Sequence, residues 1–228
     1  MKASDAYRDA LWPGGLACVG CGCASHGQSL CDDCRHLLAE CAPEGPLCPL
    51  CGHPLTEEPC PFCSGETLLL SRAAWRHRGL ARELVLSLKN GRAACADPLG
   101  EGMAEAAREL PLTDKTVVTW VTMPTERWRE RAYDHAQLLA QAVGERLGLP
   151  CLQLISRTEG AGLRHQVGLN REERLRNLRG SFFCQKQLAV PVLLVDDVTT
   201  TGSTGRLCAE ALTEAGAERV MLVTATQA

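Results

Sequence analysis

Two adjacent acids, Asp196 and Asp197, stand between a short apolar run and a loop of hydroxyl residues. The run 192–195 has the composition of a buried strand in a parallel sheet. In open α/β sheets, ligands bind outside the carboxyl ends of the strands, which is where this pattern places the two carboxylates. The loop 199–204 leads into a helical pattern, so its backbone N–H groups and hydroxyls can hold a phosphate.

Carboxylates beside a phosphate loop repel phosphate unless they face another part of the ligand. Ribose hydroxyls and Mg2+ are suitable partners, because carboxylate oxygens bind both. The pattern therefore predicts a site for a sugar phosphate with a divalent metal. A helix cap followed by an ordinary turn is the alternative without a ligand, but a cap needs only one acid.

The run 192–204 resembles the phosphoribosyl pyrophosphate (PRPP) signature of type I phosphoribosyltransferases. The resemblance implies that Asp196 and Asp197, as the catalytic pair, engage the ribose hydroxyls of PRPP. It also implies that the following loop holds the 5′-phosphate. The loop residues expected to bind PRPP are Thr199, Thr200, Thr201, Gly202, Ser203 and Thr204.

Eight of the fourteen cysteines form four Cys-x-x-Cys pairs, a spacing that lets both sulfurs of a pair reach one tetrahedral ion. A redox role for one pair is an alternative, but the repetition favours structural zinc, as one ion or two. Gly22 and Gly52 each follow a pair directly, where a turn with positive φ is expected. The sequential assignment places Cys18, Cys21, Cys31 and Cys34 on one ion and Cys48, Cys51, Cys60 and Cys63 on a second, with cross-braced pairing left open.

Charge divides the chain near residue 66. Residues 1–66 hold three basic against nine acidic side chains, whereas the remainder is mildly basic. We expect a double zinc-ribbon domain over 1–66 and a phosphoribosyltransferase-like domain over 67–228. Binding of nucleic acid through the acidic ribbon alone is unfavourable, because affinity for phosphates rests on Lys and Arg.

The chain starts with a polar segment and contains no run of about 18 apolar residues. Cysteine pairs suited to metal are typical of a reducing compartment. These features predict a cytoplasmic protein without a membrane span.

Strand-like and helical segments alternate after the cysteine pairs, which predicts a doubly wound α/β sheet. Trp75 and Trp120 lie in strand-like runs and are expected in the core. Strands are expected at 73–77, 116–121, 151–155, 192–195 and 220–224, and helices at about 80–89, 98–110, 133–147 and 205–215.

The whole chain resembles the ComF-type competence proteins. The resemblance rests on the tandem cysteine pairs, on the segments 87–91, 127–135 and 169–182, and on the PRPP run. It implies an α/β fold, a type I phosphoribosyltransferase-like parallel sheet flanked by helices, with a small N-terminal double zinc ribbon. The family usually has Gly-Phe-Asn-Gln at 132–135, where this chain has Ala-Tyr-Asp-His, and this change in charge and donors bears on substrate choice or turnover.

The resemblance also implies a function, that of a Mg2+-dependent phosphoribosyltransferase linked to DNA uptake and competence or to nucleotide metabolism. Arg127 and Arg131 are expected to hold the departing pyrophosphate, because guanidinium groups bind such oxygens bidentately. The Arg157–Arg179 segment resembles a hood over the site and is the best basic surface for single-stranded DNA. His135 and His165 are candidate acid–base groups, although the sequence gives neither a partner.

The alternative function is a non-catalytic one. In that interpretation the domain senses PRPP or binds single-stranded DNA as an adaptor in DNA uptake, with competence proteins as partners.

Overall fold

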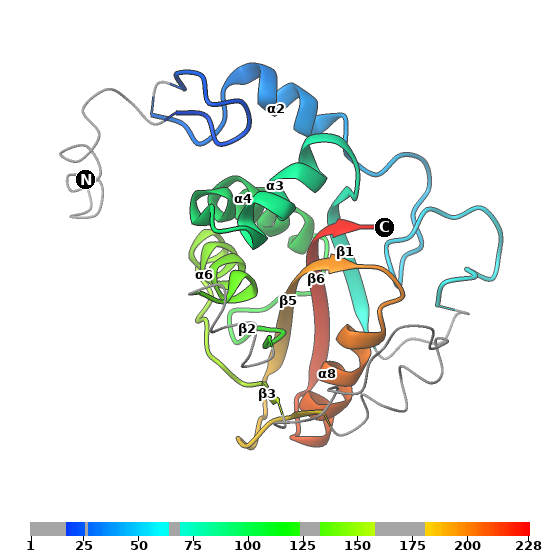
Figure 1. Cartoon of the computed structure of the whole chain (residues 1–228). Helices are drawn as coiled ribbons and strands as arrows, with labels where there is room; N and C mark the ends of the chain where they lie inside the picture. Colours follow the sequence, from blue (N-terminus) through cyan, green and yellow to red (C-terminus); the bar gives the residue numbers. More distant parts are fainter. Residues whose placement is uncertain (1–16, 26, 64–68, 124–132, 158–180) are drawn as a thin grey trace.

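The computed structural model describes residues 17–25, 27–63, 69–123, 133–157 and 181–228 (Figure 1). The helices are α2 (Asp32–Ala39), α3 (Gly79–Lys89), the 3-10 turn η1 (Ala93–Cys95), α4 (Ala96–Ala107), α6 (His135–Leu147) and α8 (Ser203–Glu214). The strands are β1 (Leu70–Arg76), β2 (Val117–Trp120), β3 (Ser156–Arg157), β4 (Phe182–Phe183), β5 (Pro191–Thr199) and β6 (Arg219–Gln227).

Four strands form a parallel sheet in the order β1-β6-β5-β2, so β5 and β6 are central. The short strands β3 and β4 form a separate antiparallel pair. Because all four strands of the main sheet are parallel, their carboxyl ends meet at one edge.

Alternating side chains of β5 enter two different cores. Val192 and Leu194 pack in the cluster that contains α8, whereas Leu193 and Val195 pack in the cluster that contains α3, α4 and α6. This period of two is that of a strand buried on both faces. Helices α3, α4 and α6 therefore cover one face of the sheet, and α8 covers the other together with β4 (Figure 1).

Most of the predicted elements are found, although β1 begins earlier and β6 ends later than expected, and α2, β3 and β4 were not predicted. Strand β5 does not end at Val195 but continues to Thr199, because β6 runs beside it and pairs Asp196 with Thr224. The strand expected at 151–155 is wrong: Cys151 makes only an isolated bridge to Val118. The ladder stops there because the Leu154 N–H donates to the Thr119 hydroxyl, at 3.1 Å, in place of a backbone carbonyl.

The two tryptophans lie in the core as predicted, with Trp75 8% and Trp120 6% exposed. The Trp75 ring packs directly against the backbone of α4 at Gly102. A Cβ at that position would lie 2.1 Å from the ring, so no larger residue fits without repacking.

The N-terminal part packs on the sheet domain at two places. Cys34 and Leu38, from α2, share one core with α3. Further along, the N–H of Ser71 in β1 donates to the Leu50 carbonyl at 2.8 Å, and its hydroxyl donates to the Cys51 carbonyl at 2.9 Å. The expected domain boundary at residue 66 lies outside the described residues.

Across the parts of the chain that the structure describes, no helix is both long enough and apolar enough to cross a bilayer.

Candidate functional site

The acid pair lies inside β5, so its two side chains project to opposite faces of the sheet. Asp197 continues the alternation of Leu193 and Val195 and faces α3 and α6, where it meets Lys89 and His135. Asp196 lies on the side of α8, where its charge adds to the effect of burial in raising the pKa of Cys208. The pleat of the strand thus gives two adjacent acids different surroundings.

Asp197 is buried and held by two basic side chains. Its Oδ2 lies 2.9 Å from Lys89 Nζ and 2.6 Å from His135 Nε2, and its side chain is only 7% exposed. Burial opposes ionisation, but the contacts with His135 and Lys89 outweigh it and hold the pKa of Asp197 below its ordinary value. Asp197 is therefore a carboxylate fixed in place by the end of α3 and the start of α6.

Asp196 has the opposite balance. Burial and the neighbouring charge of Asp197 raise the pKa of Asp196 well above its ordinary value. Its Oδ1 accepts a hydrogen bond of 2.8 Å from the Asp197 N–H, which opposes the rise without reversing it. Lys89 compensates only part of the charge of ionised Asp196, which is partly exposed toward a cavity.

Both acids line a cavity of about 210 Å³ at the carboxyl edge of the sheet. Thr204, from the first turn of α8, lines it too, as does Arg157, whose guanidinium lies 5.3 Å from the centroid of the Phe182 ring. Thr122 Oγ1 and His135 Nδ1 are buried and have no hydrogen-bond partner among the described residues. These polar groups are available to a ligand, because buried polar atoms without partners are costly.

The predicted phosphate loop is divided between two cavities. Thr204 faces the acid cavity, whereas Thr199, Thr200, Thr201 and Gly202 line a second one. Gly202 has φ of +69° and precedes α8, a backbone conformation that favours glycine. The hydroxyls of Thr201 and Ser203 lie 2.8 Å apart and order the turn.

Several predicted residues lie outside the described part of the chain. They are Arg127, Arg131 and His165, together with all of the Arg157–Arg179 segment except Arg157 itself. Their roles stay predictions.

Sequence reasoning missed Lys89 and undervalued His135. The sequence near either residue does not indicate a contact with Asp197, because His135 lies 62 positions and Lys89 lies 108 positions before it in the chain. Asp134 is the N-cap of α6 and accepts from the Ala136 and Gln137 N–H groups at 3.0 and 3.3 Å. This cap starts the helix at His135 and so positions the imidazole against Asp197.

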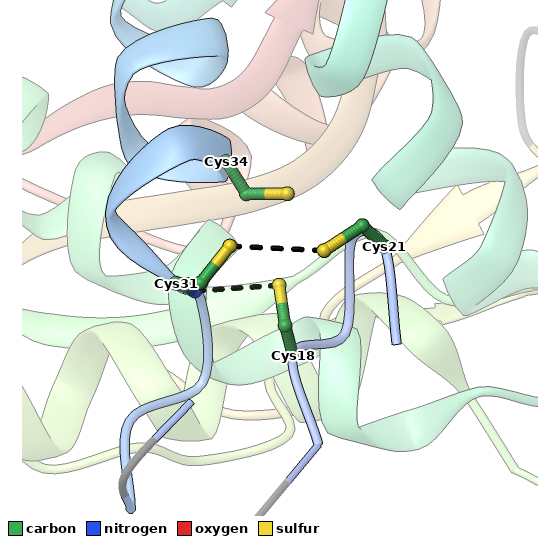
Figure 2. A group of neighbouring side chains, drawn as sticks. All are labelled: Cys18, Cys21, Cys31 and Cys34. Carbon is green, nitrogen blue, oxygen red and sulfur yellow. Dashed lines mark hydrogen bonds between the residues drawn. The ribbon is translucent and has the colours of Figure 1, made fainter. Parts of the chain in front are cut away.

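The first four-cysteine group is shown in Figure 2. The sulfurs of Cys18, Cys21, Cys31 and Cys34 all lie within 4.8 Å of one another, a grouping that agrees with the sequential assignment. Gly22, at φ of +81°, donates its N–H to the Cys18 carbonyl at 2.8 Å, the predicted turn after a pair. Burial raises the pKa of the Cys18 thiol, but backbone N–H groups around it prevail and lower that pKa to about 6, whereas burial raises the pKa of Cys34 in the same group. Zinc binding requires the thiolate of each ligand.

The second group has the same construction. Cys48, Cys51, Cys60 and Cys63 lie within 4.8 Å of one another, and Gly52, at φ of +69°, donates to the Cys48 carbonyl at 2.9 Å. Backbone N–H groups overcome burial and lower the pKa of Cys48 to about 7. Four sulfurs at these distances suit the tetrahedral geometry of structural zinc.

These features define the class of protein. A parallel sheet flanked by helices carries an acid pair near the carboxyl end of a central strand, and the N-terminal part carries two four-cysteine groups. The predicted architecture is confirmed: a parallel sheet flanked by helices, with two four-cysteine groups that fit a small N-terminal double zinc ribbon.

The chain is similar to the DNA utilization protein YhgH of Salmonella typhi, with 33% identity over 126 residues. The match covers 53% of this chain and 52% of that protein, so the chain spans about half the length of this curated relative. No family model matches the chain. The two four-cysteine groups fit the double zinc ribbon that the resemblance to ComF-type proteins implies.

Two solved structures are also similar. One is the glutamine phosphoribosylpyrophosphate amidotransferase of B. subtilis in complex with ADP and GMP, at 21% identity and a TM-score of 0.38, covering 57% of this chain and 26% of that one. The other is the allosteric regulatory enzyme of purine biosynthesis, at 21% identity and a TM-score of 0.37, covering 57% of this chain and 25% of that one.

Proposed function

We propose that this chain binds PRPP with Mg2+ at the acid cavity and acts as a phosphoribosyltransferase in DNA uptake or nucleotide metabolism. The observation that carries the proposal is the position of Asp196 and Asp197 on one cavity with Thr204, at the carboxyl edge of a parallel sheet. This is the edge at which α/β sheets bind their ligands.

The two acids have separate roles in this proposal. Asp196 binds the ribose hydroxyls or the cation, because no ion pair among the described residues engages its carboxylate and its pKa is raised. Asp197 is a positioning residue: Lys89 and His135 already hold its Oδ2. Its backbone N–H in turn orients Asp196 through the 2.8 Å hydrogen bond.

The donors at the acid cavity fit Mg2+. A carboxylate and hydroxyl oxygens are the ligands that this ion prefers, and the hydroxyl of Thr122 on the same cavity is buried without a partner among the described residues. When bound with PRPP, Mg2+ neutralises pyrophosphate charge. Asp196 and Thr122 are the residues that would hold it.

The remaining parts of the ligand have matching groups. The first turn of α8 offers Thr204 and backbone N–H groups to the 5′-phosphate. Arg157 is the described guanidinium on the acid cavity, and Arg127 and Arg131 are proposed to join it at the pyrophosphate. The acceptor that attacks the anomeric carbon would be a base or an amine.

Zinc is proposed at both four-cysteine groups. There it would stabilise the N-terminal cysteine-rich segment, which has little apolar core of its own. The buried core of the second group is made of Cys48, Cys60 and Cys63 themselves. Such a segment depends on its metal for folding.

The test is a calorimetric titration of PRPP with Mg2+ into the wild type, Asp196→Asn and Asp114→Asn. Asp114 is an exposed acid in the turn before β2. It serves as the matched control because it lies at the amino end of that strand, away from the carboxyl edge where the acid cavity lies. We expect binding to be lost only in Asp196→Asn. Equal binding in all three proteins would refute the proposal, and wild-type binding justifies a screen of bases for pyrophosphate release.

A second candidate function is supported by the similarity to a DNA utilization protein. Here the domain is a PRPP-sensing or single-stranded-DNA-binding adaptor, and the basic 157–179 segment contacts the phosphates. Binding of an oligothymidylate should then weaken steeply with salt, and the double variant Arg174→Ala/Arg176→Ala should reduce that slope by about two. Salt-independent binding, or none, would exclude this role.

A further inference from the structure

A second cavity of about 300 Å³ lies between the second four-cysteine group and the loop before α8. Phe62 and Cys63 line it on the ribbon side, and Thr200 and Gly202 line it on the sheet side. It shares no lining residue with the acid cavity, although the loop and the start of α8 stand between the two. The two cavities are therefore distinct sites on either side of one loop.

The ribbon side presents a fixed aromatic surface. The rings of His53 and Phe62 are stacked, with centroids 3.6 Å apart and planes inclined by 5°. His53 is only 8% exposed and anchors the stack, whereas Phe62 is 46% exposed. A large apolar ring held this way and left open on a cavity is a platform on which another planar ring can stack.

The sheet side presents a cation and amide groups. Arg206, in the first helical turns of α8, lines the cavity and makes no ion pair with any other described residue. Gln227, at the end of β6, adds an amide with both donors and an acceptor. No carboxylate occurs among the described residues that line this cavity, although Cys51 and Cys63 of the second four-cysteine group do line it, so Arg206 is the group there that can pair with an anion.

We propose that this cavity binds a nucleoside monophosphate, with the base stacked on Phe62 and the phosphate paired with Arg206. The volume lies at the lower end of the range of roughly 300–1,000 Å³ for small-molecule sites, which suits a single nucleotide. The nucleotide is either free or the terminal residue of a single strand. The inference does not depend on the proposed function, because Asp196 and Asp197 take no part in this site.

The loop 199–202 is a wall of this cavity and leads directly to Thr204 at the other.

The test is a calorimetric titration of AMP, and separately of an oligodeoxyadenylate with a 5′-phosphate, into the full chain, first without PRPP and then with PRPP and Mg2+ present. Phe62→Leu removes the ring, and Arg206→Gln removes the charge. Phe183→Leu and Arg219→Gln are matched controls, since both residues lie outside the two cavities. We expect each site variant to weaken AMP binding about tenfold or more, with neither control changed.

Tight AMP binding indicates a free nucleotide, and preferential binding of the oligonucleotide indicates a strand terminus. The zinc content of Phe62→Leu shows whether this variant still forms the second cysteine group. If it does not, Arg206→Gln tests the proposal instead, because Arg206 is remote from the cysteines in sequence. The proposal is overturned if the wild type binds neither probe, or if Asp196→Asn abolishes AMP binding while the two site variants retain it. PRPP titrations of the same variants report separately on the proposed function.

Discussion

Asp196 and Asp197 are neighbours in the sequence but have opposite electrostatic surroundings. Alternation along β5 places Asp197 against Lys89 and His135, and leaves Asp196 without such a partner. Only Asp197 is stabilised as an anion by the protein itself. A carboxyl group that lines a cavity and has a raised pKa is typical of a residue that binds a ligand.

We predict that Asp196→Asn stabilises the protein at neutral pH while it abolishes PRPP binding. The folded pKa of Asp196 is raised, so the carboxyl favours the folded state below the ordinary carboxyl range and loses that contribution as pH rises through its folded pKa. Asparagine cannot ionise and avoids this loss. Calorimetric melting without Mg2+ should show a rise of roughly 2–4 °C at pH 7.5, or about 1 kcal/mol. The gain should vanish near pH 4; a lower melting temperature at pH 7.5 would contradict the assignment.

Asp197→Asn should have the reverse effect. The folded pKa of Asp197 is lowered, so its contribution is present above the ordinary carboxyl range and is lost as pH falls through the folded pKa. Replacing it leaves Lys89 and His135 without their shared partner, at a cost of roughly 1–3 kcal/mol in unfolding free energy. Urea denaturation at pH 7 measures this cost, which should shrink in acid. A stabilised Asp197→Asn protein would show that the ion pairs contribute nothing.

At the scale of the elements, the turn from β5 to α8 depends on one backbone conformation. Gly202 and Gly148 have nearly identical φ, +69° and +68°, and an added Cβ meets no atom within 4 Å at either. Gly202→Ala and Gly148→Ala should each cost about 1–2 kcal/mol through backbone strain alone. Only Gly202→Ala should also weaken PRPP binding, because Gly148 ends α6 away from both cavities. Denaturation of both variants measures the cost of backbone strain, and PRPP titration measures the effect on binding. Equal PRPP affinity of the two variants would show that the turn does not shape the site.

The same turn shows how far the sequence could predict the site. Local patterns sufficed for most strands and helices after the cysteine pairs and for the two cysteine groups, whereas the PRPP-binding roles of the acid pair and its loop stay predictions. The extension of β5 to Thr199 was missed because it depends on pairing with β6, which local composition does not report. Lys89 and His135 were missed as partners because their contact with Asp197 arises only when α3 and α6 pack on one face of the sheet. The nucleotide cavity, between the ribbon and the sheet, had no local signal at all.

At the scale of the whole molecule, the two four-cysteine groups are attached differently. Cys34 of the first group is 3% exposed and shares the main core with Leu84 and Leu88 of α3. The second group packs only a small core of its own and meets β1 of the sheet through hydrogen bonds that Ser71 and Arg72 donate to carbonyls of residues 49–51. Loss of the first metal should therefore reach the sheet domain, and loss of the second should stay local.

We predict that the wild type contains two zinc ions per chain and that Cys34→Ser and Cys60→Ser each contain one, measured by elemental analysis. Cys34→Ser should lower the melting temperature of the whole chain, because it disturbs the core beneath α3. Cys60→Ser should leave the main transition within about 2 °C, since its neighbours are the other cysteines of the group. It should nevertheless abolish AMP binding, because Phe62 and Cys63 form one side of that cavity. Identical melting of the two variants would show that the ribbons and the sheet unfold as one unit.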